Sequence, residues 1–461
     1  MSEKKKVAII GAGLAGLVAA YELRDVADVT VLEAEDRIGG KLRTVPFKAG
    51  PVDMGAEAYL ARREDATEFF KGLGLEESMR YPSGLPSAVY ADGKLHSMPR
   101  GTLMGIPAKG ETVKGICSDE TVIRIDDEAT LPPLAWTPGQ DMSVGALVRE
   151  RYGDEVVDRL VNPLLGGVYS CFADDLSVRA TVPKLAKALD SGATSLSAAV
   201  ASVIPSFSTE AASGNGGTRP VFANFATGYH EVYDALAEKS GAEIYVDEFI
   251  SGIKQQPDGT WLVNNKAYSV VILAVPAPTA GALVAQVDKE IGTKIRQIQL
   301  ASSAVVGFAF AEDSFIPQNS GILVASDADL RAKAFTFWSR KWPHVAARGG
   351  AVVRVSFGRL GDDALVRAEE EVLVDTAMED LAKVLGTDIP EPTEVFVQRW
   401  YGGLPRIAPG HQELIAEIEQ GLAAHPGLYV AGAWTHGVGV PDIIASTRAL
   451  AAEIEERLRN A

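Results

Sequence analysis

The sequence predicts an α/β protein of several lobes: a Rossmann-type nucleotide-binding lobe, a second lobe built on a sheet, and a mostly helical insert. Residues 7–33 hold a strand, a glycine-rich turn, a helix and a second strand in that order. Residues 109–200 have mainly helical patterns, and residues 301–399 hold apolar runs of strand length around one long helix. At 461 residues the chain exceeds one typical core, so more than one lobe is expected.

The first stretch that carries chemistry is the glycine-rich turn after the first strand. Residues 7–10 form an apolar run with the length of a buried parallel strand. Three glycines follow at G-x-G-x-x-G spacing, namely Gly11, Gly13 and Gly16. In a dinucleotide-binding turn the first glycine permits the tight turn, the second leaves room for a pyrophosphate, and the third lets helix and strand pack closely. The N–H groups at the start of the following helix then face the phosphates.

An acidic residue completes this unit. The second strand, residues 29–32, ends on Glu33, which lies 20 residues after Gly13. A carboxylate at that distance binds a ribose hydroxyl in dinucleotide folds. A lone glycine motif is weak evidence, because an ordinary glycine turn has the same spacing. Here strand, glycines, helix, second strand and acid agree, so a nucleotide cofactor is predicted, although the unit alone does not separate NAD from FAD.

The next residues favour FAD. Residues 37–44, R-I-G-G-K-L-R-T, resemble the R-x-G-G-R-x-x-[ST] signature of the flavin amine oxidase superfamily. Lys41 stands where many members carry Arg. The glycine pair suits a close approach of the backbone to a cofactor. The alternative is a glycine-rich surface turn.

Composition and charge exclude several classes of protein. The formal net charge of −17 argues against a nucleic-acid partner and against attachment to anionic lipid, because both need a basic surface. Cys117 and Cys171 are the only cysteines, and none of the six histidines stands in an H-E-x-x-H pattern, so no metal site is expected. The apolar stretch 270–287 contains Pro276 and Pro278, which favours a strand, a turn and a helix over a membrane span. No signal peptide precedes the first strand, so a cytoplasmic location is expected.

The C-terminal part of the chain is predicted to return to the first lobe. Residues 428–433 form a buried strand, and a helix is expected from about residue 441 to residue 457. The glycine-rich start of this helix can approach a flavin ring and stabilise negative charge on it, although a plain surface helix has the same pattern. Residues 205–220 are rich in Ser, Gly and Thr and predict a mobile linker.

We therefore expect three domains, two of them discontinuous. These are a FAD-binding domain of residues 1–70, 222–276 and 396–461, a substrate-binding domain of residues 71–108, 201–221 and 277–395, and a helical domain of residues 109–200.

Further stretches resemble those of porphyrinogen oxidases, and they run through essentially the whole chain in order. They are residues 98–107, residues 162–169 with 176–180, residues 341–344 and residues 437–442. The chain is similar to the soluble bacterial branch of that family, whose members are coproporphyrinogen III oxidases, also described as protoporphyrinogen oxidases.

The resemblance implies one non-covalent FAD and the oxidation of a porphyrinogen to a porphyrin in heme biosynthesis. Six electrons would leave the tetrapyrrole in three flavin cycles, with dioxygen as acceptor and hydrogen peroxide as product. Coproporphyrinogen III is the expected substrate, since its four propionates make it more anionic and more water-soluble than protoporphyrinogen IX. Three alternatives remain. They are the oxidation of protoporphyrinogen IX, another activity of the superfamily such as amine oxidation or carotenoid desaturation, and a role as a FAD-bearing carrier protein. A ferrochelatase is the expected recipient of the product, and no catalytic base is assigned.

The resemblance also implies the flavin contacts. They are Gly11, Ala12, Gly13, Leu14, Ala15, Gly16, Glu33, Ala34, Lys41, Gly55, Ala56, Glu57, Ala58, Ile250, Trp400, Val438, Gly439 and Val440. Residues 55–58 depart from the more usual G-P-D-S, so only backbone contacts are expected there. For Trp400 the alternative is a core aromatic.

A tetrapyrrole with propionate groups calls for basic residues at its site. The candidates are Arg62, Arg63, Arg100, Arg340 and Lys341. The alternative for each is a solvated surface charge.

Overall fold

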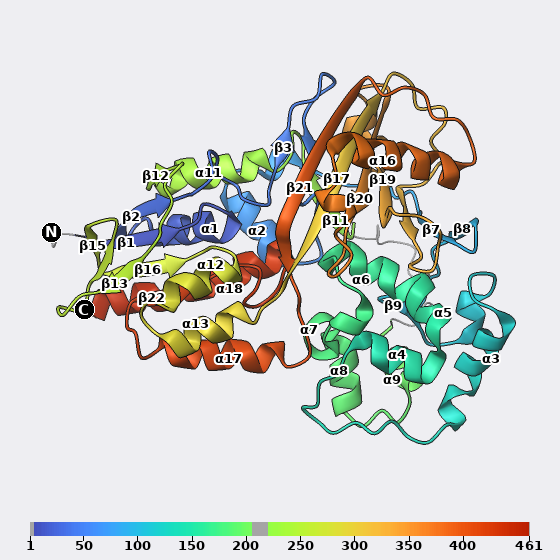
Figure 1. Ribbon diagram of the computed structural model, residues 1–461, viewed down its shortest axis with the longest axis horizontal. Coiled ribbons are helices and arrows are strands. Elements are labelled where there is room, and N and C mark those ends of the chain that lie inside the picture. Colours follow the sequence, from blue (N-terminus) through green and yellow to red (C-terminus); the bar gives the residue numbers. More distant parts are fainter. Residues whose placement is uncertain (1–3, 205–219, 461) are drawn as a thin grey trace. The chain divides into compact units, whose positions relative to one another are not determined.

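The computed structural model describes residues 4–204 and 220–460 (Figure 1), so nearly all of the linker expected at residues 205–220 lies outside the described residues. Contacts divide the chain into two compact units. Unit 1 comprises Met1–Tyr81, Pro220–Gln299 and Gln412–Ala461, and unit 2 comprises Pro82–Arg219 and Leu300–His411. This division groups residues 71–81 and 277–299 with unit 1 and residues 396–411 with unit 2, which differs from the expected boundaries. A helical domain separate from unit 2 stays a prediction.

Unit 1 is built on a five-stranded parallel sheet with strand order β12-β2-β1-β16-β22. The strands are β12 (Glu243–Tyr245), β2 (Ala27–Leu32), β1 (Lys5–Ile10), β16 (Val270–Leu273) and β22 (Leu428–Val430). The Rossmann-type lobe predicted from the glycine turn is therefore confirmed, and the C-terminal strand does return to this sheet.

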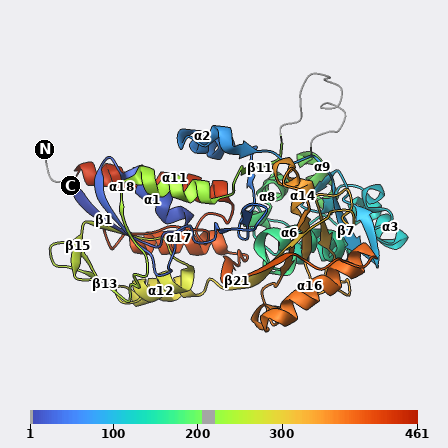
Figure 2. The ribbon, with the colours of Figure 1, turned by 90° about the horizontal axis from the view of Figure 1, so that it is seen from above.

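Helices cover both faces of this sheet (Figures 1 and 2). One face carries α1 (Leu14–Leu23), α11 (His230–Ser240) and α18 (Val440–Asn460); the other carries α12 (Ala277–Val284), α13 (Lys289–Arg296) and α17 (His411–Leu422). Because strand side chains alternate, Val7 and Ile9 of β1 pack with the first set and Ala8 and Ile10 with the second. Burial on both faces explains why this strand is a continuous apolar run.

Smaller elements complete unit 1. They are β3 (Thr44–Val45), β4 (Val52–Asp53), β5 (Tyr59–Leu60), α2 (Glu64–Gly72), β6 (Met79–Arg80), β11 (Phe222–Phe225), β13 (Ile253–Gln255), β14 (Trp261–Val263) and β15 (Lys266–Tyr268). β11 lies between β5 and β6, and β13, β14 and β15 form a separate antiparallel sheet.

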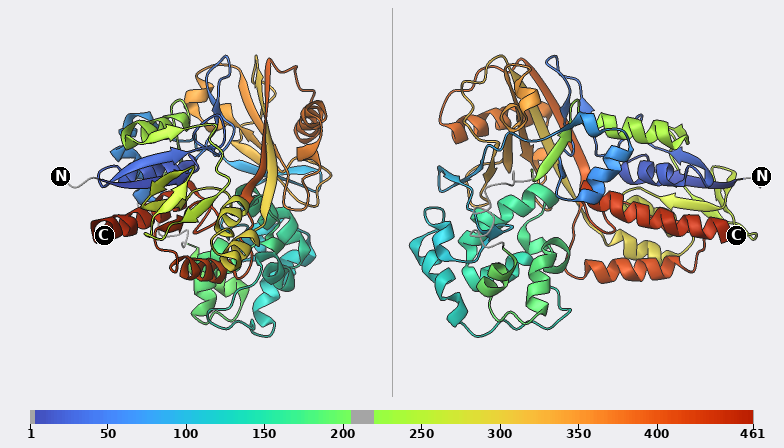
Figure 3. Two further views of the ribbon diagram at one scale, coloured as in Figure 1. Left: turned by 60° about the vertical axis from the view of Figure 1, so that its left-hand side comes forward. Right: turned by 180° about the vertical axis from the view of Figure 1, so that it is seen from behind.

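Unit 2 contains a seven-stranded sheet with order β21-β17-β20-β19-β18-β7-β8, in which only the β18–β7 pair is parallel. The strands are β7 (Ser87–Ala91), β8 (Lys94–Ser97), β17 (Leu300–Phe310), β18 (Gly321–Val324), β19 (Ala334–Phe337), β20 (Ala351–Phe357) and β21 (Glu394–Pro405). The long helix α16 (Glu370–Leu385) packs Leu373, Ala377 and Leu381 into the core that it shares with this sheet. Figure 3 shows this helix, in orange, beside the sheet. The predicted sheet-based lobe is thus confirmed.

Helices make up most of residues 109–200, as the sequence predicts, and the last of them runs on to Val203. They are α3 (Asp119–Asp127), α4 (Val144–Tyr152), α5 (Asp154–Val156), a π-helical turn (Val157–Val161), α6 (Asn162–Tyr169), α7 (Val178–Thr181), α8 (Pro183–Asp190) and α9 (Leu196–Val203). The remaining elements of unit 2 are β9 (Thr102–Leu103), β10 (Ile106–Pro107), α14 (Trp338–Lys341) and α15 (Pro343–Ala346). Across residues 4–204 and 220–460, no helix combines the length and apolar character that a bilayer crossing requires.

A buried ion pair ties the helical part together. The Arg151 Nε donates to the Glu128 Oε1 at 2.6 Å, and the two side chains are 5% and 0% exposed. Glu128 also accepts hydrogen bonds from the Leu196 N–H at 2.9 Å and from the N–H and hydroxyl of Ser197. Burial raises the pKa of Glu128, but these hydrogen bonds outweigh burial and hold it below the usual carboxyl value. One carboxylate thus joins the end of α3, α4 and the start of α9.

Replacing this carboxylate should destabilise unit 2 strongly. Glu128→Gln leaves the Arg151 charge buried without a counter-ion, and such a change costs about 3–5 kcal/mol. Urea unfolding followed by circular dichroism measures the loss. Lys114→Ala removes an exposed lysine paired with Glu111 and is the control. An unfolding midpoint for Glu128→Gln equal to that of Lys114→Ala would contradict the role given to the pair.

Candidate functional site

Two of the three motif glycines are required by the protein's own packing. Gly11 has φ +104°, and a Cβ there would lie 2.5 Å from the Ala274 carbonyl oxygen. A Cβ on Gly16 would lie 1.9 Å from the Gly11 carbonyl oxygen. Both contacts involve backbone atoms that cannot turn away. Gly11 therefore permits the turn and Gly16 permits α1 to pack on the end of β1, as the sequence predicts.

Gly13 differs from these two glycines. Its backbone is extended, with φ −71° and ψ −178°, so its conformation does not require glycine. A Cβ there would meet no atom nearer than the Gly40 Cα at 3.9 Å. Gly13 is the N-cap of α1, and no side chain caps this helix end. The open space beside uncapped N–H groups fits a pyrophosphate, which such a helix terminus binds.

The glycine pair of residues 39–40 packs directly on the phosphate loop. The Gly39 N–H donates to the Ala12 carbonyl at 2.8 Å. Gly40 has φ +54°, and a Cβ there would lie 3.0 Å from the Gly13 Cα. The Arg37 Nη2 donates to the Gly40 carbonyl at 2.9 Å and holds this loop closed. The glycine pair therefore lets the backbone of residues 39–40 lie close to the backbone of the phosphate loop at Ala12 and Gly13.

Arg37 was not among the residues predicted to form the site. The motif could have identified it, since Arg37 is the first residue of the R-x-G-G stretch. Its role in the structure is to hold the loop in place.

Glu33 lies beside the phosphate loop at the carboxyl end of β2. Its Oε2 accepts the Ala12 N–H at 2.6 Å, and its Oε1 accepts the Glu35 N–H at 2.9 Å. Its backbone is held as well, because the Glu248 N–H donates to the Glu33 carbonyl at 2.7 Å. A carboxylate offers about four acceptor positions, so the half-buried Glu33 can still accept a ribose hydroxyl.

The residues expected near Glu33 are placed as follows. Ala34 is exposed directly after Glu33, and Ile250 is 4% exposed in the core of unit 1. β13 begins at Ile253, so Ile250 lies in the loop before this strand.

Residues 55–58 run beside the glycine pair. A Cβ on Gly55 would lie 1.9 Å from the Lys41 carbonyl oxygen, so only glycine fits there. The Ala56 N–H donates to the same carbonyl at 3.3 Å, while the Lys41 side chain is exposed. Ala56, Glu57 and Ala58 are each half-buried. The predicted contacts at 11–16, 33, 41 and 55–58 therefore come from neighbouring loops of unit 1.

The start of α18 carries the last predicted flavin contacts in unit 1. Gly437 has φ +142°, Val438 and Gly439 are half-buried, and Val440 opens the helix. Asp442 in the first turn pairs with Arg63, which also pairs with Asp65 at 2.8 Å. Arg63 thus has two internal carboxylate partners, and its binding of a propionate stays a prediction.

The other predicted basic residues are not gathered in one unit. Arg62 is exposed in unit 1, and Arg100 is exposed in unit 2. Arg340 pairs with Asp313 at 2.6 Å and donates to the carbonyls of Asp313 and Ile316. The Lys341 Nζ lies 5.6 Å from the centre of the Trp342 ring. Arg340 therefore has a structural role, since it holds the segment from Asp313 to Ile316 in place.

Trp400 lies on β21 of unit 2, beside an irregularity in the sheet. The pairing of β17 with β21 shifts between the Ser303–Trp400 pair and the Ala301–Leu404 pair. Gly402 in this bulge has φ +57°, and its N–H donates to the Ser302 hydroxyl at 3.1 Å. Bulges of this kind redirect side chains and occur often near active sites. Trp400 as a flavin contact stays a prediction.

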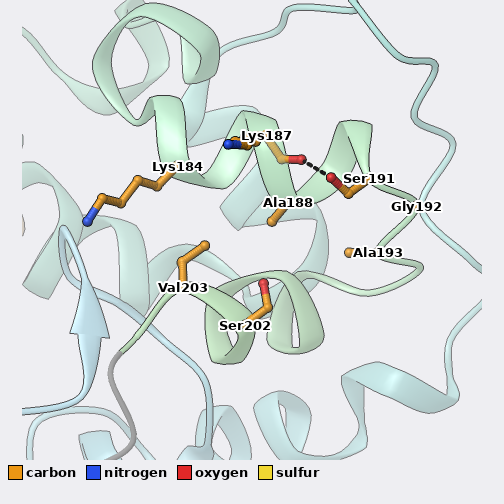
Figure 4. A pocket seen from close by; sticks show the side chains of 8 residues that line it. All are labelled: Lys184, Lys187, Ala188, Ser191, Gly192, Ala193, Ser202 and Val203. Atoms are coloured by element: carbon orange, nitrogen blue, oxygen red, sulfur yellow. Dashed lines mark hydrogen bonds between the residues drawn. The ribbon is translucent and has the colours of Figure 1, made fainter.

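A pocket of about 400 Å³ lies between α8 and α9 (Figure 4). Its lining includes Lys184, Lys187 and Ser191, and the Ser191 hydroxyl donates to the Lys187 carbonyl at 2.8 Å. It contains none of the predicted site residues, so we do not assign it to the cofactor or the substrate. Within residues 4–204 and 220–460 no cluster of His, Cys, Asp and Glu is arranged to hold a metal ion.

Comparison with known proteins gives one consistent result. The family model described as flavin containing amine oxidoreductase matches residues 14–454. A coproporphyrinogen III oxidase from Mycobacterium leprae is 40% identical over 97% of this chain and 98% of its own length, and one from Bacillus subtilis is 28% identical over 97% of each chain. A crystal structure from an Exiguobacterium species, provisionally described as a protoporphyrinogen oxidase, has a TM-score of 0.86 and 29% identity, and covers 99% of this chain and 100% of its own.

Substituting Gly13 should separate cofactor binding from folding. Gly13→Val places a branched side chain where the pyrophosphate is predicted to bind, yet its Cβ would meet no protein atom nearer than 3.9 Å. We expect a folded protein whose FAD affinity is at least about tenfold weaker, or about 1.4 kcal/mol. Titration of the apoprotein with FAD measures this. Gly16→Val is the matched control and should fail to fold, because its side chain meets the Gly11 carbonyl. Full FAD occupancy in Gly13→Val would mean that the phosphates bind elsewhere.

Removing the Glu33 carboxylate should weaken FAD binding as well. Glu33→Ala loses the ribose acceptor and releases the Ala12 N–H, which we expect to cost about 1–3 kcal/mol of FAD binding. Glu33→Gln keeps an acceptor oxygen and should lose less. The quenching of flavin fluorescence on binding gives both affinities. Equal affinities for Glu33→Ala and the native protein would remove Glu33 from the site.

Proposed function

The chain belongs to the flavin-containing amine oxidoreductase family, and on that basis we propose that it is a FAD-dependent coproporphyrinogen III oxidase with dioxygen as electron acceptor. The observation that supports this choice of substrate is the 40% identity to the Mycobacterium leprae coproporphyrinogen III oxidase over 97% of this chain. The open position at Gly13 beneath the uncapped end of α1 independently supports a dinucleotide cofactor.

When bound, FAD would supply the redox chemistry, two electrons at a time with dioxygen as acceptor, so the six-electron oxidation of a porphyrinogen would take three cycles and yield three hydrogen peroxide. The chain's own residues bind and orient it. The N–H groups at the start of α1 receive the pyrophosphate, and Glu33 receives the ribose hydroxyl. The contacts proposed at Ile250 and Trp400 rest on resemblance to the family.

The start of α18 is proposed to stabilise negative charge on the bound cofactor. A helix N-terminus carries about half a positive charge. Asp442 in the first turn would oppose that effect, but Arg63 pairs with it. We therefore assign Arg63 a positioning role in which it neutralises Asp442. This role competes with its predicted role as a propionate partner.

The physical case for coproporphyrinogen III over protoporphyrinogen IX rests on charge and solubility. The four-propionate substrate is the more anionic and the more water-soluble of the two, and each desolvated carboxylate needs a cationic or hydrogen-bonding partner. The proposal includes a cytoplasmic location, supported by a net charge of −17 that disfavours anionic lipid surfaces. It also includes handover of the porphyrin to a ferrochelatase, since a metal-free porphyrin is what such an enzyme uses.

Side-by-side kinetics decide between the two substrates. We expect kcat/KM for coproporphyrinogen III to exceed that for protoporphyrinogen IX by about tenfold or more in detergent-free buffer, since one charged hydrogen bond contributes about 1.5–3 kcal/mol. Oxygen uptake and porphyrin fluorescence give the rates, with Gly13→Val as the cofactor-deficient control. A higher value for protoporphyrinogen IX would overturn the substrate assignment and leave the family intact.

A further inference from the structure

Two buried cations lie together at one end of the unit 2 sheet. Lys333 directly precedes β19 and Arg359 follows β20 after one residue, and the two residues are 6% and 8% exposed. β19 and β20 pair antiparallel, so the start of one strand lies beside the end of the other. The Lys333 N–H donates to the Ser356 carbonyl at 2.8 Å, which continues this pairing.

Lys333 joins the sheet to the end of α6. Its Nζ donates to the Ser170 hydroxyl at 2.6 Å and to the Gly358 carbonyl at 2.9 Å. Ser170 caps α6 in a left-handed conformation with φ +51°, and its carbonyl accepts the Leu360 N–H at 2.8 Å. The segment that carries Arg359 is therefore fixed against α6.

Arg359 is buried without a counter-ion. Its buried Nε has no hydrogen-bond partner, and among residues 4–204 and 220–460 no carboxylate forms a hydrogen bond or an ion pair with its guanidinium. Its carbon Cζ lies 5.3 Å from the centre of the half-buried Phe172 ring. A Cβ on Gly166 would come within 3.3 Å of Nε. Asp362 is bound to Arg359 only through the backbone: the Arg359 N–H donates to the Asp362 carbonyl at 3.1 Å, and the Asp362 N–H donates to the Arg359 carbonyl at 2.9 Å.

The electrostatic cost of this arrangement is high. Burial, and then the positive charge of Arg359, lower the pKa of Lys333 to about 7. Burial also lowers the pKa of Arg359, and the charge of Asp362 opposes this only in part. The contrast is Arg151 in the same unit, whose burial is matched by Glu128. Buried charges are normally paired, so two adjacent cations without a carboxylate partner suit an anionic ligand.

The surface beside these cations suits a flat, apolar ligand. The last turn of α6 exposes Gly167 and Val168, the latter 44% exposed, and Phe172 follows two residues after the helix cap. We propose that Arg359 receives a carboxylate of the substrate, a propionate of the tetrapyrrole, while Lys333 acts behind it as a positioning residue. This inference rests on the proposed function and names a contact for one propionate.

Equilibrium binding of the product tests the contact without turnover. The probes are coproporphyrin III and its tetramethyl ester, which has the same macrocycle without the charges. We expect Arg359→Gln to raise the Kd of the acid about 10- to 100-fold and to leave the Kd of the ester unchanged. Lys333→Met should lower the preference for acid over ester by a smaller factor. Arg331→Gln, which removes an exposed charge two residues from Lys333, should preserve both values.

Kinetics provide a second readout, because losing a contact to an unreacting propionate in Arg359→Gln should raise KM for coproporphyrinogen III and change kcat little. Far-UV circular dichroism and FAD absorbance report folding. The ratio of the Kd of the acid to the Kd of the ester is measured within each variant, so a reduced folded fraction does not affect it. If Arg359→Gln fails to fold, the same ratio measured for Lys333→Met tests the contact.

Two outcomes overturn the inference in distinguishable ways. If native protein oxidises coproporphyrinogen III but Arg359→Gln and Lys333→Met keep its acid-to-ester ratio, the carboxylate contact is wrong and the proposed function stands. If native protein neither oxidises coproporphyrinogen III nor binds coproporphyrin III, both the proposed function and the contact fail.

Discussion

The contact between Gly16 and the Gly11 carbonyl is the constraint on which the cofactor-binding unit depends. With no side chain at Gly16, α1 lies so close to the end of β1 that a Cβ would be 1.9 Å from that carbonyl. This closeness fixes where the first turn of α1 points. The Glu33 carboxylate then binds the Ala12 N–H, and the Gly39 N–H binds the Ala12 carbonyl. Any shift of α1 would move both of these loops, because they are attached to the same residue.

The glycines around the predicted phosphate site differ in what requires them. At Gly11, Gly16 and Gly55 a side chain would collide with backbone, so the fold itself requires glycine. At Gly13 neither the backbone conformation nor a close neighbour requires it. Because Gly13 is also the N-cap of α1, the space beside it is best explained by a bound phosphate group. This distinction comes from geometry and cannot be made from the G-x-G-x-x-G spacing alone.

Local pattern predicted much of the fold. Apolar runs predicted β1, β2, β16 and β22, and the glycine turn predicted where α1 begins. The extension of β21 to Pro405 was missed, because Gly402 and Gly403 look like a strand end and instead form a bulge. Contacts between distant residues could not be predicted: Asp442 lies 379 residues from Arg63, and Lys333 lies 163 residues from Ser170. Long-range partners decide which cations are already neutralised, so the sequence alone cannot tell a propionate partner from a structural cation such as Arg340.

The order of segments along the chain has a consequence for biosynthesis. The central strand β1 is translated first, but its neighbour β16 and the next strand, β22, come much later, and α18 packs on α1 only at the end. Unit 2 lies wholly between residues 82 and 411, so all its residues leave the ribosome before β22 does. Domains generally fold as units in the order of their synthesis. Unit 2 can therefore fold while the nucleotide-binding sheet still lacks its edge strand β22, so this sheet is completed only when the last part of the chain has left the ribosome.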